Sequence, residues 1–245
     1  MFLNSHSYYS LRYGTYSIDA LVQEAVKRKI AAMALTDINN SSGMIDFVKS
    51  CKAHNIKPIG GMEFRDGNEL LFTGISRNNK GFREINEYMS ALNLKEKKHT
   101  LSAPEFSDVY VIYPFEKIFE LCHSEQSEES HHPEYMYNRD TSLTLSMTKR
   151  CLPKPHRLKD NEFIGVKPSQ IHKLLTLSKN KLTKMVVQQP VTFCDKKTWY
   201  LHKNLRAINN NILLSQLTPN MYSQQDEVFT TEADIITTFE QYPQI

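Results

Sequence analysis

The sequence predicts an α/β fold in which helices cover a parallel sheet or barrel. Short apolar runs alternate with amphipathic segments along most of the chain, and short turns separate these units. The chain has 245 residues, of which 40% are hydrophobic, so it can build one large α/β domain with a sizeable core. The alternation alone does not distinguish an open sheet from a closed barrel.

The first half of the chain carries the clearest element signals. Ser17 can cap a helix whose apolar residues recur at helical spacing, and Asn40 to Ser42 can cap a second helix that contains Met44 and Phe47. Strands are expected where short apolar runs end at turn residues. The expected order is a helix at 18–29, a strand at 31–36, the second helix, strands at 56–60 and 70–75, and a helix at 79–92.

The second half continues the same alternation after a gap. Pro168 suits the first turn of a helix, because its missing N–H has no partner there. A long amphipathic segment follows the last expected strand. The expected elements are a strand at 109–112, a short helix at 116–121, a strand at 162–166, a helix at 168–177, a strand at 184–187, a helix at 196–217 and a final helix from residue 232.

Residues 122–156 interrupt this pattern. The segment is rich in Ser, Glu and His, lacks sustained periodicity and is too long for an ordinary connection in a compact domain. We expect a non-globular surface insertion there. A more specific hypothesis is that the segment is a translated inverted DNA repeat. The codons that could pair as reverse complements are those of Cys122, His123 and Glu125 with those of Thr148, Met147 and Leu145.

Composition excludes several classes of protein. The formal charge is only +3, and no dense basic stripe is interleaved with aromatic residues, so direct DNA binding is not indicated. No apolar run approaches about 18 residues, so no membrane span is expected. The four cysteines form no C-x-x-C pair, which indicates reduced thiols in a cytoplasmic protein. They are Cys51, Cys122, Cys151 and Cys194.

Three short patterns place a polar residue at the end of an expected strand or at the start of the chain. A His, an Asp and a Glu gathered at the carboxyl ends of barrel strands suit Mn²⁺ or Zn²⁺. The predicted ligands are His6, Asp37 and Glu63. Taken singly, His6 could be a hydrogen-bonded structural histidine, Asp37 a helix cap, and Glu63 the partner of a neighbouring lysine. The patterns are Asn4-Ser5-His6-Ser7-Tyr8-Tyr9-Ser10-Leu11, Leu35-Thr36-Asp37-Ile38-Asn39 and Lys57-Pro58-Ile59-Gly60-Gly61-Met62-Glu63-Phe64.

These patterns, in this order, resemble the PHP (polymerase and histidinol phosphatase) domain of bacterial DNA polymerase III alpha subunits. That domain opens with His-x-His-Ser-x-Tyr-Ser-Leu and continues with Leu-Thr-Asp-His-Gly and Ile-Lys-Pro-Ile-x-Gly-x-Glu. The resemblance implies a distorted (β/α)7 TIM-like barrel at 1–217, interrupted by the insertion at 122–156. It also implies a linker and helix at 218–245 that leads towards a polymerase body, and hence a truncated chain.

The resemblance also implies that most of the family's metal ligands are missing. Asn4 replaces the first histidine of His-x-His, and Ile38 replaces the histidine after Asp37. The family's Asn-Asp-x-His block falls on Gln189-Pro190-Val191-Thr192, so two more ligands are lost. We therefore expect no cofactor, or at most one weakly bound Mn, Zn or Mg ion. Conceivable substitute donors are Asn4, Asp66, His99 and His202.

The function that the resemblance implies is a part of a replicative or error-prone DNA polymerase III alpha subunit. With a degenerate metal site, we expect a structural and interaction role and no catalytic residues. The expected partners are the remainder of the alpha subunit, if a separate gene encodes it, and a proofreading exonuclease. The family's palm aspartates, which bind two Mg²⁺ for nucleotidyl transfer, lie beyond the matched region. The alternative is a residual metal-dependent phosphoesterase or 3′–5′ exonuclease.

Overall fold

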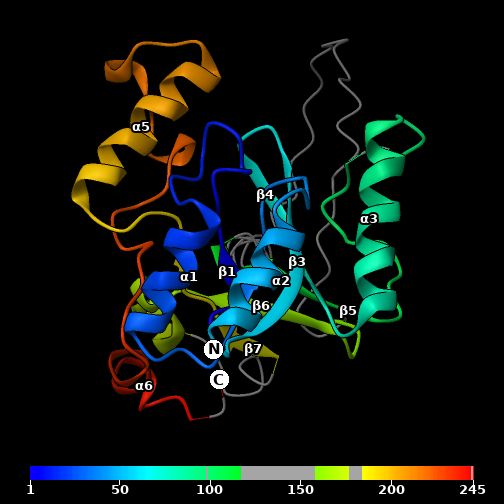
Figure 1. Cartoon of the computed structure of the whole chain (residues 1–245), viewed down its shortest axis with the longest axis horizontal. Coiled ribbons are helices and arrows are strands. Elements are labelled where there is room, and N and C mark those ends of the chain that lie inside the picture. Colours follow the sequence, from blue (N-terminus) through cyan, green and yellow to red (C-terminus); the bar gives the residue numbers. More distant parts are fainter. Residues whose placement is uncertain (98, 117–157, 177–183, 244) are drawn as a thin grey trace, which may run out of the picture.

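The computed structural model describes the whole chain except residues 98, 117–157, 177–183 and 244. The predicted insertion at 122–156, its inverted-repeat origin and nearly all of the predicted helix at 116–121 lie outside the described residues. Within the described part, the protein is a mixed α/β fold built on a curled sheet (Figure 1).

Six strands form the main sheet. Its outer pairs are parallel, but one strand runs antiparallel to both of its neighbours, so the expectation of a wholly parallel sheet was wrong. The cause is a two-residue hairpin at Gly67-Asn68, where Gly67 adopts a φ of 60°. In spatial order, the strands are β2 (Ala32–Leu35), β3 (Lys57–Asp66), β4 (Glu69–Ser76, the antiparallel strand), β5 (Val109–Pro114), β6 (Glu162–Val166) and β7 (Met185–Val187).

Two short strands lie between the edges of this sheet. β1 (Asn4–Ser5) pairs in parallel with β8 (Pro190–Val191). The chain around β1 also bonds to β2, because the Thr36 amide donates to the Ser5 carbonyl at 2.9 Å. The stretch 185–191 therefore pairs with β6 through its first half and with β1 through its second half. This shared stretch connects the two ends of the curled sheet.

Helices cover the outside of the sheet. Figure 1 shows α1 and α2 close together, while α3 and α5 lie at opposite sides of the molecule. The Ser17 cap is confirmed, since its hydroxyl accepts from the Ala20 amide at 3.2 Å. No helix among the described residues is long and apolar enough to cross a membrane. The helices are α1 (Ile18–Lys27), α2 (Met44–Ala53), α3 (Asn79–Asn93), α5 (Lys196–Asn210) and α6 (Glu232–Phe239).

Three helix predictions need correction. The helix expected at 196–217 ends at Asn210, because Asn211 adopts the left-handed conformation with φ 52° and terminates it. The segment Pro168–Thr176 is a 3₁₀ helix, η2, and not an α-helix. The N-cap of α2 is Gly43, without a side-chain cap bond; the Asn40 side chain accepts instead from the Ser42 amide at 3.1 Å, outside the helix.

Buried apolar residues fall into two main clusters on the two parts of the sheet. One joins β3–β7 to α3, with Phe64 and Phe72 stacked at its centre. The other joins β2 to α1 and α2, with Phe2 and Phe47 fully covered. Polar residues are also buried, and they gather where β1, β2, β3 and β8 approach one another. That polar interior is the candidate site.

Candidate functional site

The three predicted ligands lie on neighbouring strands and are all buried. His6 directly follows β1, Asp37 lies two residues after β2, and Glu63 lies inside β3; each is about 1% exposed. Glu63 does not follow its strand as expected, because β3 continues to Asp66 and pairs there with β4. The backbone of Glu63 bonds directly to that of Asp37, at 3.2 Å from amide to carbonyl oxygen.

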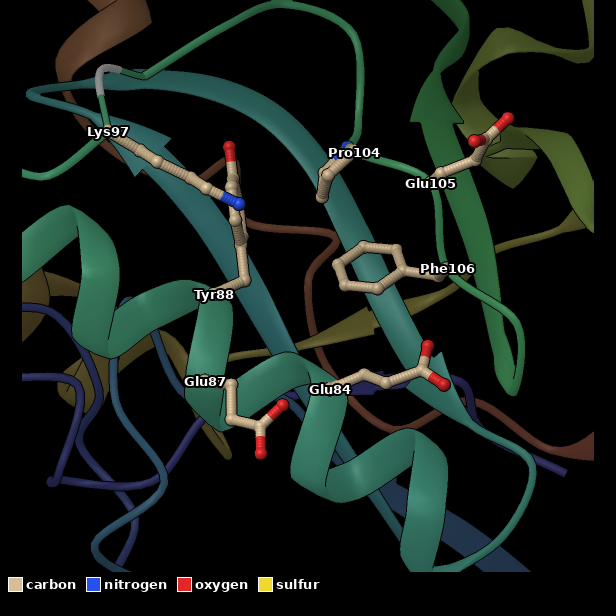
Figure 2. A pocket seen from close by; sticks show the side chains of 7 residues that line it. All are labelled: Glu84, Glu87, Tyr88, Lys97, Pro104, Glu105 and Phe106. Atoms are coloured by element: carbon tan, nitrogen blue, oxygen red, sulfur yellow. The ribbon is translucent and has the colours of Figure 1, made fainter.

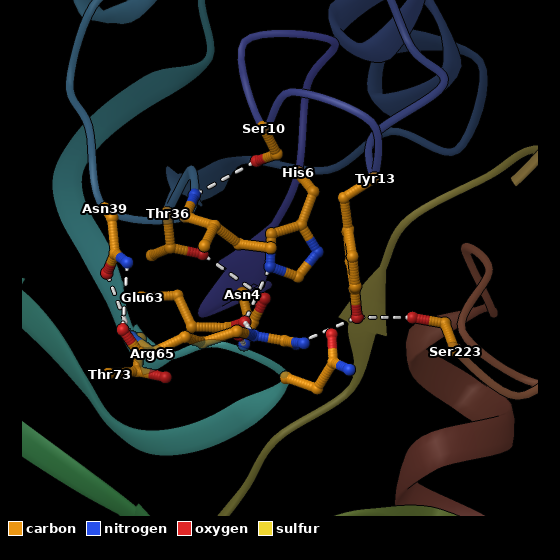
Figure 3. Close-up of polar contacts among 12 residues, drawn as sticks. Asn4, His6, Ser10, Tyr13, Thr36, Asn39, Glu63, Arg65, Thr73 and Ser223 are labelled. Carbon is orange, nitrogen blue, oxygen red and sulfur yellow. Dashed lines mark hydrogen bonds and ion pairs between the residues drawn. The ribbon is translucent and has the colours of Figure 1, made fainter. Parts of the chain in front are cut away.

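His6 and Glu63 point towards each other (Figure 3). His6 Nε2 lies 3.2 Å from Glu63 Oε2, within ion-pair distance, but it has no partner in hydrogen-bond geometry. Asn4 Nδ2 donates to the same carboxylate oxygen at 2.9 Å. The Thr36 hydroxyl donates to Asn4 Oδ1 at 3.2 Å, which fixes the orientation of the amide. Asn4 thus acts as a hydrogen-bond donor to Glu63.

The side chain of Asp37 binds the loop after β1. Its carboxylate accepts hydrogen bonds from the Ser7 amide at 2.7 Å, the Ser7 hydroxyl at 2.7 Å and the Ser10 hydroxyl at 2.6 Å. These bonds attach the loop after β1 to the end of β2. The structure therefore brings His6 and Glu63 together and directs the Asp37 carboxylate to Ser7 and Ser10.

A largely buried cation, which the sequence patterns did not reveal, binds Glu63: the side chain of Arg65 is 13% exposed. Arg65 Nε lies 2.5 Å from Glu63 Oε1, and Nη2 donates to the Tyr13 hydroxyl at 2.8 Å (Figure 3). The guanidinium also lies 4.5 Å from the centroid of the Tyr13 ring. Burial opposes ionisation of Glu63, but Arg65, His6 and Asn4 outweigh it and hold the pKa of this carboxyl well below its usual range.

A second buried carboxylate lies on the other side of His6. Thr192 Oγ1 is 3.1 Å from His6 Nδ1 and donates to Glu227 Oε2 at 2.9 Å. Lys167 Nζ lies 2.9 Å from Glu227 Oε1, with about a third of its side chain exposed. Burial opposes ionisation of Glu227, but Lys167 outweighs it and lowers the pKa of this carboxyl to about 2. Glu227 lies in the predicted linker, which thus contributes to the site.

His202 closes the network beside Tyr13. Its Nδ1 lies 2.7 Å from the Tyr13 carbonyl oxygen, and its Nε2 accepts from the Ser223 amide at 2.9 Å. The Tyr13 hydroxyl is 2.5 Å from the Ser223 hydroxyl. Because both ring nitrogens are engaged, His202 is not available as a substitute metal ligand. Burial lowers the pKa of His202 to about 4.

The other conceivable donors do not complete a metal site. Asn4 Nδ2 donates to Glu63, and its Oδ1 accepts from the Thr36 hydroxyl. Asp66 lies opposite Glu69 at the β3–β4 turn, and His99 follows α3. Among the residues that the structure describes, no group of three or more His, Cys, Asp or Glu side chains is arranged to hold a metal ion. The guanidinium bound to Glu63 also places a positive charge directly beside this carboxylate, and that charge repels a divalent cation. The donor set does not fit a multinuclear metal cluster.

Sequence reasoning missed four members of this network. Lys167 directly follows β6, so the rule that found His6 and Asp37 could have included it. Arg65 lies two residues after Glu63 in β3, so the alternation of an extended strand could have placed both side chains on one face. Tyr13 and Glu227 carried no comparable signal, because only the fold brings them to this network. Thr192 was singled out as a lost ligand, and the structure does place it against His6.

The cavity in Figure 2 lies elsewhere, between α3 and the segment before β5, and it has a volume of about 210 Å³. Its acidic lining is largely occupied, since Glu84 accepts from the Ser107 amide at 2.8 Å and Glu105 pairs with Lys159 at 2.9 Å. None of the predicted site residues reaches it. Its lining consists of Glu84, Glu87, Tyr88, Lys97, Pro104, Glu105 and Phe106.

His202 makes the stability of this region depend on pH. Its pKa is about 4 in the folded chain and about 6.5 in an unfolded one, so only the unfolded chain takes up a proton between these values. Stability is therefore complete above pH 6.5 and falls towards pH 4, by up to roughly 3 kcal/mol. We expect His202→Gln to flatten this fall.

Urea unfolding at pH 7 and pH 5 measures the effect of His202. The control is His54→Gln, which changes an exposed histidine at the end of α2. Equal losses of stability between the two pH values in the wild type and in His202→Gln would contradict the assignment.

A family model and several curated proteins are similar to this chain. The family model described as "PHP domain" matches residues 3–148. The DNA polymerase III subunit alpha of Halalkalibacterium halodurans is 23% identical over 252 residues, covering 99% of this chain and 21% of that protein. The subunit alpha of Ureaplasma parvum is 41% identical over 88 residues, which cover 36% of this chain and 9% of that protein. The subunit alpha of Bacillus subtilis is 36% identical over 101 residues, which cover 39% of this chain and 9% of that protein. The chain thus spans about a fifth or less of these relatives.

Solved structures give weaker likenesses. A candidate metal-dependent phosphoesterase from Bifidobacterium adolescentis has a TM-score of 0.33 and 10% identity, covering 98% of this chain and 63% of that one. An amidohydrolase from Chromobacterium violaceum has a TM-score of 0.27 and 18% identity, covering 41% and 40%. At these scores neither contributes to the assignment. The family model, however, matches more than half of the sequence, and on that ground the chain belongs to the PHP domain family.

Proposed function

We propose that this PHP domain serves a structural and interaction role in a bacterial DNA polymerase III alpha subunit, replicative or error-prone, and not a hydrolytic one. The observation that carries the proposal is the buried ion pair between Arg65 and Glu63, at 2.5 Å. In this pair, the carboxylate of Glu63, which the third sequence pattern predicted as a metal ligand, neutralises the guanidinium of Arg65. Similarity to DNA polymerase III alpha subunits over 99% of the chain supports the polymerase context.

The rest of the site supports a degenerate metal centre. Asp37 accepts three hydrogen bonds from Ser7 and Ser10, and Ile38 and Pro190 stand where the family pattern has ligands. We propose that the site holds no metal, or at most one weakly bound divalent ion. Losing supporting partners alone costs about 10–100-fold in metal affinity or activity, and here direct ligands are missing as well.

We also propose that the curled sheet is a distorted (β/α)7 barrel of the PHP type. The stretch 185–191 supports this, since it pairs with β6 on one side and with β1 on the other. In such a barrel the buried network would fill the space that other proteins of this architecture use for ligands. The proposed partners are the remainder of the alpha subunit and a proofreading exonuclease, which places the action of the domain in the cytoplasm.

The alternative, a residual metal-dependent phosphoesterase or 3′–5′ exonuclease, is favoured by one observation. His6 Nε2 is buried, faces Glu63 and lacks a hydrogen-bond partner. A histidine nitrogen in this condition is available to a metal ion. The presence of Arg65 on the same carboxylate favours the structural role over this alternative.

Thermal unfolding with and without Mn²⁺ or Zn²⁺ tests the proposal, together with an assay of 3′–5′ degradation of labelled single-stranded DNA. Ligands that bind the folded state raise the melting temperature. We expect one cooperative transition that does not respond to either metal, and no degradation above background. A metal-dependent rise that disappears in His6→Ala, accompanied by degradation, would overturn the structural role.

A further inference from the structure

The hydrogen bonds around His6 define which ring nitrogen carries a proton. The Thr192 hydroxyl has a single hydrogen, and it donates this hydrogen to Glu227 Oε2 at 2.9 Å. The ionised Glu227 carboxylate can only accept. Thr192 Oγ1 must therefore accept the bond from His6 Nδ1 at 3.1 Å, and so Nδ1 bears the hydrogen.

The other nitrogen of His6 is consequently left facing a carboxylate. Nε2 faces Glu63 Oε2 at 3.2 Å, within ion-pair distance, and has no partner in hydrogen-bond geometry. A bond from Nδ1–H to an acceptor that leads on to a carboxylate is the arrangement that orients histidines as metal ligands. His6 and Glu63 thus keep the orientation of a ligand pair.

The cation that balances Glu63 comes from the chain itself. Arg65 binds the second carboxylate oxygen, Oε1, and is held by the Tyr13 hydroxyl at 2.8 Å and by the face of the Tyr13 ring. Tyr13 is in turn held by Ser223. The guanidinium is therefore positioned from two sides and cannot leave the carboxylate without losing both contacts.

From this geometry we infer that the Arg65 guanidinium replaces a bound cation, and that its charge keeps divalent metal ions away from the retained pair of His6 and Glu63. The inference rests on the proposed function, in which the wild-type site is closed to metal. A neutral residue at position 65 leaves the buried Glu63 carboxylate without its guanidinium, and an uncompensated buried carboxylate attracts a cation.

The test is the metal response of Arg65→Gln, which keeps a donor near Glu63 and Tyr13 but removes the charge. We expect its melting temperature to rise by roughly 5 °C or more with saturating Zn²⁺ or Mn²⁺, whereas the wild type does not respond. Arg65→Lys is the matched control, because it retains the positive charge and should remain insensitive. His6→Ala in the Arg65→Gln background should abolish the response.

The outcomes separate the two proposals. If Arg65→Gln folds and its melting temperature does not change with Zn²⁺ or Mn²⁺, the inference is overturned and the structural role stands. A response of the wild type itself overturns the structural role. If Arg65→Gln does not fold without metal, its refolding is followed by circular dichroism. Recovery of the folded signal with Zn²⁺ supports the inference, and failure to recover, while Arg65→Lys folds, overturns it.

Discussion

Replacing Glu63 with alanine is expected to destabilise the protein by about 3–5 kcal/mol, because the change leaves the Arg65 guanidinium buried without its carboxylate. Asn4 and His6 lose the same partner. For a chain of this length, each 1 kcal/mol lowers the melting temperature by about 2–4 °C, so a drop of roughly 6–20 °C is expected.

Chemical denaturation of Glu63→Ala beside Glu105→Ala measures this effect. Glu105 pairs with Lys159 at 2.9 Å, but its side chain is 88% exposed, so its loss should cost about 0–1 kcal/mol. The double variant Glu63→Gln with Arg65→Met removes both buried charges and should recover much of the stability lost in Glu63→Ala. If Glu63→Ala costs no more than Glu105→Ala, the buried pair is not a major support of the fold.

The elements were predictable from sequence where local signals decide them. The alternation of apolar runs located β2, β5, β6 and β7 to within a few residues, and the Ser17 cap located the start of α1. The direction of β4 was not predicted, although Asp66-Gly67 is a hairpin signal, because the repeated strand–helix pattern suggested parallel pairing throughout. The end of α5 depended on the left-handed conformation of Asn211.

The site was predictable only in part, for a physical reason. His6 and Glu63 lie in recognisable patterns, and the arrangement of β1, β2 and β3 brings them to 3.2 Å. Arg65 lies only two residues after Glu63 in β3, but its second contact, with Tyr13, depends on the fold. Glu227 joins the network through Thr192, which requires the chain near residue 227 to approach the end of β8. Asp37 was predicted as a ligand, although two serines of the first pattern, Ser7 and Ser10, bind its carboxylate. The hydrogen bonds from Ser7 to Asp37 require the backbone of Ser7 to lie directly against Gly14.

Gly14→Ala is expected to destabilise the protein by about 4 kcal/mol or more, which corresponds to a fall in melting temperature of roughly 8–16 °C. A Cβ atom at Gly14 would lie 1.8 Å from the Ser7 carbonyl oxygen and 2.5 Å from its carbon. The backbone of Ser7 would have to move, although its amide and hydroxyl both bind Asp37 at 2.7 Å. Hydrogen bonds to a buried charged group contribute about 1.5–3 kcal/mol each, so displacing Ser7 is costly.

Thermal unfolding of Gly14→Ala should be compared with that of Gly67→Ala, because the two glycines are needed for different reasons. Gly67 has a φ of 60°, and a Cβ atom added there would have no neighbour within 4 Å, so alanine meets only backbone strain of about 1–2 kcal/mol. Gly14 instead meets a fixed backbone carbonyl. A larger loss at Gly67 than at Gly14 would mean that the loop after β1 can yield without disturbing Asp37, and the Ser7–Asp37 bonds would then not be what holds the His6 loop in place.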